Sequence, residues 1–177
     1  AATIADIAPT RKGLAMDLAG SWSLAPSSPH RSFDDTPVPD SSAEWHSVDL
    51  PARTLGAGDD SALLAGPCVW LRRHIEVDSA RAAGHAALHW EVLRWGGVAY
   101  VNGEPVGRSA HWGPATLTIP PGILRSGKNE ILLKVRTWDA LQRGGTLGWP
   151  LVAAGSAVFS WGGTHSMLPG RIAVEFY

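Results

Sequence analysis

Residues 98–107 constrain the fold more than any other part of the chain, because their pattern is that of a β-hairpin. The centre of this stretch is Asn102-Gly103, a dipeptide that favours a two-residue type I′ turn because both residues tolerate positive φ angles. A second strand is predicted over residues 130–136, after a turn at residues 126–129. We expect the rest of the chain to sandwich this hairpin and strand.

The predicted strand 130–136 has the two-residue period of a β-strand with one buried face. Its apolar residues recur at Ile131, Leu133 and Val135. Leu132 interrupts the pattern by placing an apolar side chain on the polar face. The segment is therefore predicted to be a mostly buried strand.

Short segments of alternating apolar and polar residues recur along the rest of the chain, separated by turn residues. The further predicted strands are 18–24, 45–51, 69–77, 87–92, 116–119 and 171–177. Residues 25–43 and 56–66 are predicted loops, residues 79–84 a small-residue connection, and residues 1–17 an N-terminal extension that is either a leader strand or a short helix. No sustained helical period occurs, so the fold class is predicted to be all-β, a β-sandwich of the jelly-roll type formed by residues 18–177 as a single domain.

Composition excludes several classes of protein. The 177 residues are 45% hydrophobic and 18% charged, which is typical of a folded globular domain rather than a disordered chain. A formal net charge of -1 gives no electrostatic reason to expect nucleic acid or an anionic membrane as a partner. No run of about 18 apolar residues is present, so no transmembrane helix is predicted.

Cys68 is the only cysteine, which rules out an intrachain disulfide and a cysteine-based metal site. Its apolar neighbours predict a buried and unreactive thiol. A single cysteine is compatible with an oxidising compartment. The chain has neither an initiator Met nor a recognisable signal peptide, so we expect a processed mature protein or a domain cut from a larger one.

Five short motifs then follow one another in a recognisable order. They are Leu18-x-Gly20-x-Trp22, Trp45-x-x-Val48-x-Leu50-Pro51, Trp70-Leu71-Arg72-Arg73, Tyr100-Val101-Asn102-Gly103 and Gly127-Lys128-Asn129-Glu130-Ile131. Together they resemble the sugar-binding jelly-roll domain of family 2 glycoside hydrolases, a member of the galactose-binding-like group that also occurs in some rhamnosidases and sialate esterases. The closing stretch, residues 169–176, is similar to the last strand of that domain, and the resemblance covers residues 18–177.

The resemblance implies an accessory domain of a carbohydrate-active enzyme, with catalysis carried out elsewhere. The implied partners are a polysaccharide or oligosaccharide and the catalytic domain of a parent enzyme, and the implied location is secreted or periplasmic. In some family members an acidic loop after the Asn-Gly hairpin reaches the active site of the neighbouring domain. The corresponding residues 108–113 contain no carboxylate, which argues against a borrowed catalytic role.

The nine Trp residues divide into two groups by their surroundings. Trp22, Trp45, Trp70 and Trp90 alternate with strand residues and are predicted to belong to the core. The other five fall at strand ends or in loops, where they either pack under their own loop or bind a ligand. The loop group is Trp95, Trp112, Trp138, Trp149 and Trp161.

A sugar site needs an aromatic face for stacking and a few fixed polar groups that bind hydroxyls. Loop Trp residues with polar neighbours supply both, although a solvated surface role also explains those polar neighbours. The candidate sugar-binding residues are Trp112, Trp149, Trp161, His111, His165, Asp139 and Arg143.

Other suggestive patterns have simpler explanations. Turn formation accounts for Asn102 without a ligand. Residues 56–60 include two adjacent Asp, a weak pattern for one structural Ca²⁺ of the kind that galactose-binding-like domains often hold. The spacing of His85 and His89 suits zinc only on a helix, and a strand is predicted there. We therefore predict no cofactor, no metal ligand and no catalytic residue.

Two functions from different classes remain open. The first is a non-catalytic carbohydrate-binding domain of a secreted glycan-degrading enzyme. The second is a structural module whose loop Trp residues pack against a catalytic domain and which binds no glycan alone. A third possibility, an autonomous hydrolase, would need two carboxylates about 5–10 Å apart, and no such pair is evident in the sequence.

Overall fold

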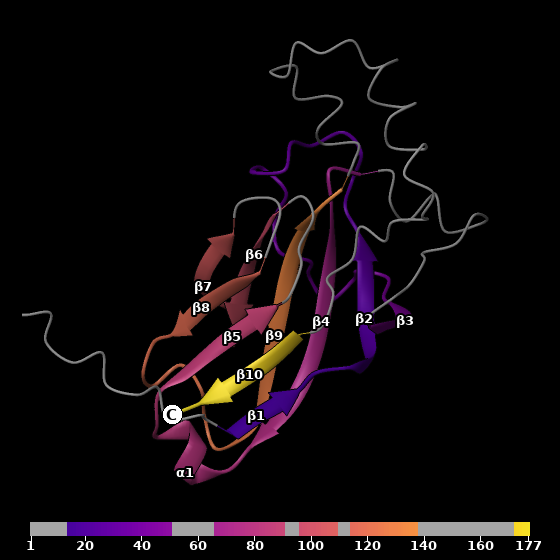
Figure 1. Ribbon diagram of the computed structural model, residues 1–177. Helices are drawn as coiled ribbons and strands as arrows, with labels where there is room; N and C mark the ends of the chain where they lie inside the picture. Colours follow the sequence, from indigo (N-terminus) through magenta and orange to yellow (C-terminus); the bar gives the residue numbers. More distant parts are fainter. Residues whose placement is uncertain (1–13, 51–65, 91–95, 110–113, 138–171) are drawn as a thin grey trace, which may run out of the picture.

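The computed structural model describes residues 14–50, 66–90, 96–109, 114–137 and 172–177, which form two antiparallel sheets (Figure 1). The four-stranded sheet has the order β1-β10-β5-β8, and the six-stranded sheet has the order β3-β2-β4-β9-β6-β7. The strands are β1 (Leu14–Asp17), β2 (Gly20–Pro26), β3 (His46–Leu50), β4 (Cys68–Val77), β5 (Ala86–Trp90), β6 (Gly97–Val101), β7 (Glu104–Ser109), β8 (Ala115–Ile119), β9 (Gly127–Arg136) and β10 (Ile172–Phe176).

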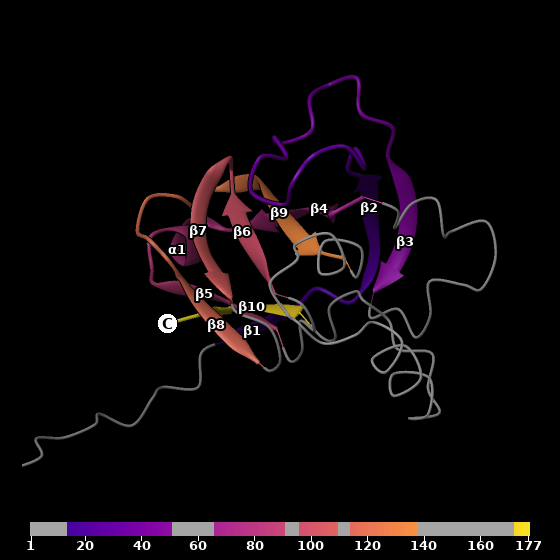
Figure 2. The ribbon, with the colours of Figure 1, turned by 90° about the horizontal axis from the view of Figure 1, so that it is seen from above.

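The two sheets face each other as a sandwich, seen along its long axis in Figure 2. The chain changes sheet between β1 and β2, between β4 and β5, between β5 and β6, between β7 and β8, and at each later connection. Repeated crossing between two antiparallel sheets is the connectivity of a jelly roll. The predicted all-β sandwich is confirmed.

The predicted hairpin is present, but it lies at an edge of the sheet rather than at its centre. Asn102 has a φ angle of 52° and Gly103 one of 84°, as a type I′ turn requires. The centre of the six-stranded sheet is the pair β4 and β9, which runs in register over ten residues from Cys68↔Arg136 to Val77↔Gly127. This pairing extends β9 back to Gly127, into the predicted turn at residues 126–129.

One connection differs from the prediction, and the described end of the N-terminal segment is a strand, one of its two predicted forms. The small-residue segment 79–84 contains a one-turn helix, α1 (Ser79–Ala82), because the carboxylate of Asp78 accepts a hydrogen bond from the Arg81 backbone and caps the helix. Within the N-terminal residues 1–17, β1 pairs with β10 and forms an edge of the four-stranded sheet. No helix of the described segments is long and apolar enough to cross a membrane.

The main core fills the space between the sheets. Its members come from both sheets and alternate along each strand, as the two-residue period predicts. Large members that are at most 2% exposed include Trp22, Trp90, Leu24, Leu71, Leu88, Ile131 and Ile172. The predicted core positions of Trp22, Trp70 and Trp90 are confirmed, with Trp70 buried on the outer face of the six-stranded sheet.

A second core lies on that outer face. Residues 27–45 pass over this face of the sheet (Figure 2). Phe33 from this segment packs with Trp70 and Leu132, so the side of β9 that reads as polar in the sequence is buried at Leu132 and Lys134. Leu132 therefore belongs to the second core. Trp45 is half-buried and packs against the edge of this second core, with the Arg72 guanidinium 3.8 Å from its ring centre, so it borders the core rather than lying inside it.

Candidate functional site

All seven candidate sugar-binding residues lie outside the described residues. His111 and Trp112 fall in segment 110–113. Segment 138–171 holds the other five, Asp139, Arg143, Trp149, Trp161 and His165. The possible calcium loop at residues 56–60 and two other loop tryptophans, Trp95 and Trp138, also lie outside, so these assignments remain predictions.

The strand ends that flank these segments are described, and they lie together. In the six-stranded sheet, Gly97 at the start of β6 pairs with Ser109 at the end of β7 and with Val135 near the end of β9. In the four-stranded sheet, Trp90 at the end of β5 pairs with Ala115 of β8 and with Ile172 of β10. These ends form the upper end of the sandwich in Figure 1. The two segments that carry the predicted residues therefore start and finish at the same end of the fold.

A hollow of about 400 Å³ opens on the outer face of the six-stranded sheet. One wall is the β6–β7 hairpin and the other is the segment 27–45. Its lining mixes apolar, aromatic and charged side chains, as small-ligand sites usually do. The lining residues are Phe33, Asp34, Val98, Tyr100, Pro105, Val106, Gly107, Arg108 and Lys134.

Strand register brings two cations to this hollow. Lys134 of β9 lies opposite Val98 of β6, and Val98 lies opposite Arg108 of β7. Side chains opposite one another in a sheet point to the same face, so Lys134 and Arg108 flank Val98 in one row. Tyr100 is two residues from Val98 along β6, and its ring centre lies 5.8 Å from that of Trp70.

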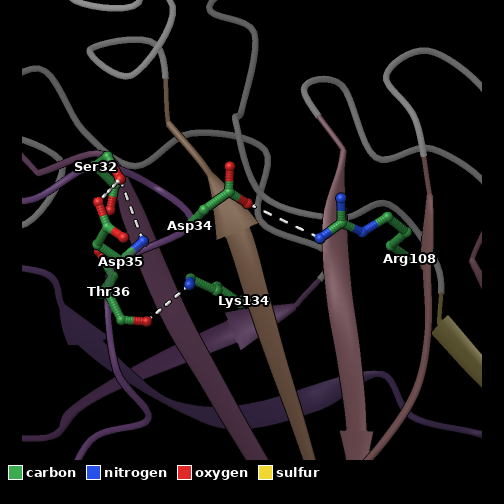
Figure 3. Close-up of polar contacts among 6 residues, drawn as sticks. All are labelled: Ser32, Asp34, Asp35, Thr36, Arg108 and Lys134. Carbon is green, nitrogen blue, oxygen red and sulfur yellow. Dashed lines mark hydrogen bonds and ion pairs between the residues drawn. The ribbon is translucent and has the colours of Figure 1, made fainter.

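Lys134 is 4% exposed, which is unusual for a lysine. Its ammonium donates a hydrogen bond of 2.7 Å to the Thr36 carbonyl oxygen (Figure 3). It also lies 4.7 Å from the ring centre of Phe33 and 5.3 Å from that of Trp70. Burial lowers the pKa of Lys134 below its ordinary value, with a partial opposing effect from Cys68 and Asp34.

The mouth of the hollow carries the opposite charges of Arg108 and Asp34. Their nearest side-chain atoms are 3.9 Å apart, and both side chains are more than 70% exposed (Figure 3). An exposed pair of this kind contributes about 0–1 kcal/mol, so each group can exchange its partner at little cost. Both groups are therefore available to a ligand.

The residues next to Asp34 hold it in a compact turn. The Ser32 hydroxyl donates to the Asp35 carboxylate at 2.6 Å, and the Thr36 hydroxyl donates to the Ser32 carbonyl at 2.7 Å. Phe33 belongs to this turn, and the Arg136 guanidinium lies 4.0 Å from its ring centre. The turn thus fixes the wall of the hollow opposite the hairpin.

The sequence prediction missed this hollow. It read residues 25–43 as a plain loop and β9 as polar on one face. The available signals were Leu132, an apolar residue among polar neighbours, and Phe33, a large aromatic inside a loop rich in Pro, Ser and Asp. Together they indicate that the loop covers the sheet.

Metal chemistry finds no support in the described part of the chain, where no group of three or more His, Cys, Asp or Glu side chains comes together. His85 is exposed and precedes β5, while His89 lies within β5 and makes a 3.0 Å contact with the Thr116 hydroxyl. No helix therefore carries this pair, as predicted. Cys68 is a free thiol and 0% exposed, which confirms the buried position expected for it.

Searches against protein-family models and curated proteins found no match. Among solved structures, the chain is similar to part of several β-glucuronidases. The enzyme from Bifidobacterium dentium, complexed with coumarin-3-O-glucuronide, is 19% identical, with a TM-score of 0.57 over 73% of this chain and 21% of that one. The enzyme from an uncultured Clostridium sp. is 16% identical, with a TM-score of 0.55 over 73% of this chain and 23% of that one. The enzyme from Ruminococcus gnavus, in complex with D-glucuronic acid, is 13% identical, with a TM-score of 0.55 over the same shares of the two chains.

These similarities establish a shared fold, since all three identities are below 20%. The chain spans less than a quarter of the length of each enzyme. It therefore has the fold of one part of a β-glucuronidase, a jelly-roll sandwich.

Proposed function

We propose that this chain is a non-catalytic carbohydrate-binding domain of a secreted glycan-degrading enzyme, with a polysaccharide or oligosaccharide as its ligand. The observation that carries the proposal is the match of 73% of the chain to only 21–23% of the β-glucuronidases. A part of that size corresponds to an accessory domain. The partner inside the parent enzyme would be its catalytic domain.

The geometry of the described segments supports binding in two ways. The strand ends that flank the predicted Trp-containing segments meet at one end of the sandwich. Beside them lies a hollow lined by both charged and aromatic groups. Over the same segments, the exposed large apolar side chains are Val38 and Tyr177. Polar and aromatic groups around a hollow suit a sugar better than a flat apolar docking surface does.

The test is a binding screen of the purified chain on a broad glycan array, with Trp112→Ala and Trp161→Ala alongside. The matched control is Tyr177→Ala, which removes an exposed aromatic side chain from the C-terminal residue, next to the Phe176↔Ala86 pair at the other end of β5. Binding by the chain and by the control, but not by a folded Trp variant, is the expected result. Absence of binding to every glycan would contradict the proposal and favour a structural domain that packs against a catalytic domain.

A further inference from the structure

The buried ammonium of Lys134 lies at the base of the hollow, and the proposed function gives it no role. Lys134 lines this hollow while 96% of its surface is covered, and within the described part of the chain its one hydrogen bond goes to the neutral Thr36 carbonyl. An ammonium has three donors, so two of them are left for a ligand. The carboxylate that lines the hollow, Asp34, lies beside Arg108 instead.

The hollow has an excess of positive charge. Among the described residues, two cations, Lys134 and Arg108, line it against one carboxylate, Asp34, and the Arg136 guanidinium lies 4.0 Å from the ring centre of Phe33. Among the described residues no carboxylate forms an ion pair with the buried Lys134 ammonium, and a buried charge without a close partner is costly, so an anion that enters the hollow gains more than it would at the open surface. The exposed pair of Arg108 and Asp34 is weak enough for an incoming anion to compete for the guanidinium.

The other lining groups suit the body of a sugar ring. Tyr100 and Val98 are half-buried and provide an aromatic and an aliphatic surface next to the two cations. Asp34, once released from Arg108, is an acceptor for ring hydroxyls. A volume of about 400 Å³ falls within the range of small-ligand sites and is matched to one or two sugar units rather than to a long chain.

We infer that the hollow between segment 27–45 and the β6–β7 hairpin binds an acidic sugar, with the sugar carboxylate between Lys134 and Arg108. Arg108 offers two parallel N–H donors to a carboxylate, and Lys134 offers a point charge at the base of the hollow. This inference rests on the proposed function, because it names the class of sugar and adds a site to the predicted Trp residues.

The test is calorimetric titration of the full chain with matched pairs of oligosaccharides. The acidic members are oligomers of glucuronic, galacturonic or mannuronic acid, and the neutral members are the same oligomers of glucose, galactose or mannose. We expect at least one acidic oligomer to bind about 10-fold more tightly than its neutral counterpart, the size of one charge-assisted hydrogen bond. Sulfated oligomers form a third arm, and stronger binding of these than of the uronates would overturn the choice of a carboxylate.

Variants locate the site. Arg108→Ala should weaken binding of the acidic oligomer about 10-fold, and Arg108→Glu should weaken it further, because both changes affect an exposed side chain. Arg125→Ala is the matched control, since it removes one exposed arginine from the turn before β9 and should change affinity less than about two-fold. Lys134→Met should remove the preference for the acidic oligomer, with the thermal midpoint measured to establish folding.

The outcomes separate this inference from the proposed function. Binding of neutral glycans alone, lost in Trp112→Ala or Trp161→Ala, would overturn the acidic-sugar site and leave the proposed function standing. Unchanged affinity of both Arg108 variants for the acidic oligomers would also overturn the acidic-sugar site and leave the proposed function standing. No binding to any glycan would overturn both.

Discussion

Asn102, in the turn of the β6–β7 hairpin, donates a hydrogen bond from Nδ2 to Oδ1 of Asn129, at the start of β9, over 2.8 Å. The same amide donates to the Ile123 carbonyl at 2.7 Å, and its oxygen accepts from the Glu130 backbone N–H at 2.9 Å. Asn129 is 1% exposed and also accepts from the Arg125 backbone N–H at 2.8 Å. Two asparagines thus hold together the hairpin turn, the turn before β9 and β9 itself.

Replacing Asn102 should therefore cost more than a turn residue usually does. Asn102→Ala removes three hydrogen bonds of about 1 kcal/mol each and leaves a non-glycine residue at positive φ, so we expect a loss of about 2–4 kcal/mol in the free energy of unfolding. Asn102→Gly keeps the positive φ without strain and should cost about 1 kcal/mol less. Urea unfolding measures both, and a cost near zero for Asn102→Gly would show that the side chain contributes little.

A comparison of two buried tryptophans measures how much one buried hydrogen bond contributes to stability. Trp22 and Trp90 are 2% and 1% exposed. The Trp22 indole N–H donates to the Leu18 carbonyl at 2.9 Å, whereas that of Trp90 has no partner among the described residues. Arg73 also donates to the Leu18 carbonyl, so this oxygen stays satisfied in Trp22→Phe. We expect Trp22→Phe to lower the free energy of unfolding by about 1 kcal/mol more than Trp90→Phe does, and equal losses would contradict this reasoning.

Gly66 is predicted to be far less replaceable than Gly103. A Cβ atom on Gly66 would lie 2.2 Å from the Ser27 carbonyl oxygen, a backbone atom, while one on Gly103 would meet nothing within 4 Å. Gly66→Ala must therefore move the start of segment 27–45, at a cost of about 3 kcal/mol. Gly103→Ala bears only the strain of a φ angle of 84°, about 1 kcal/mol. Thermal and urea unfolding of the two variants give the comparison, and the reverse order would be inconsistent with the close contact.

Sequence alone predicted most strands and the hairpin turn of this fold, because apolar and polar residues alternate within each strand. The buried pattern of Trp22 and Leu24 in β2 and the turn at Asn102 are encoded within a few residues. The prediction was wrong where pairing with a distant segment determines the bounds of a strand. The extension of β9 to Gly127 depends on pairing with Val77, about 50 positions earlier in the chain. The helix α1 was missed although Asp78 is a standard capping residue.

The hollow was beyond sequence reasoning for the same reason. Lys134 and Thr36 are 98 positions apart, and the burial of Lys134 depends on the position of Phe33 over the sheet. A lysine on the polar side of a strand is ordinarily solvated, so its own neighbours in the sequence give no sign of burial. By contrast, the loop tryptophans were selected from local context alone and remain predictions.

Cys68 should be unreactive in the folded protein and reactive once unfolded. It is 0% exposed, and burial raises its pKa above the ordinary value of 9.0. We expect alkylation of the folded protein at pH 8 to be at least about 100-fold slower than alkylation in guanidinium chloride, because reaction requires opening of the structure. As the pH rises, the Cys68 thiol ionises in the unfolded chain before it ionises in the folded protein. The thiol's contribution to the free energy of unfolding therefore falls as the pH rises above 9.0. Comparable alkylation rates in both conditions would contradict the burial of Cys68.

Lys134 should give a pH dependence of the opposite sign. Burial lowers its pKa from the ordinary value of 10.5, so the unfolded chain holds this proton more tightly than the folded one. Its contribution to the free energy of unfolding therefore rises with pH from the lowered pKa to 10.5 and is complete above that value. We expect this rise in Cys68→Ala, where the thiol no longer titrates, and its absence in Cys68→Ala with Lys134→Met. The other charged groups that act on Lys134 are Asp34, Arg108 and Arg136, and both proteins contain all three. Urea unfolding at a series of pH values measures the difference, and parallel stability curves for the two proteins would show that Lys134 is solvated.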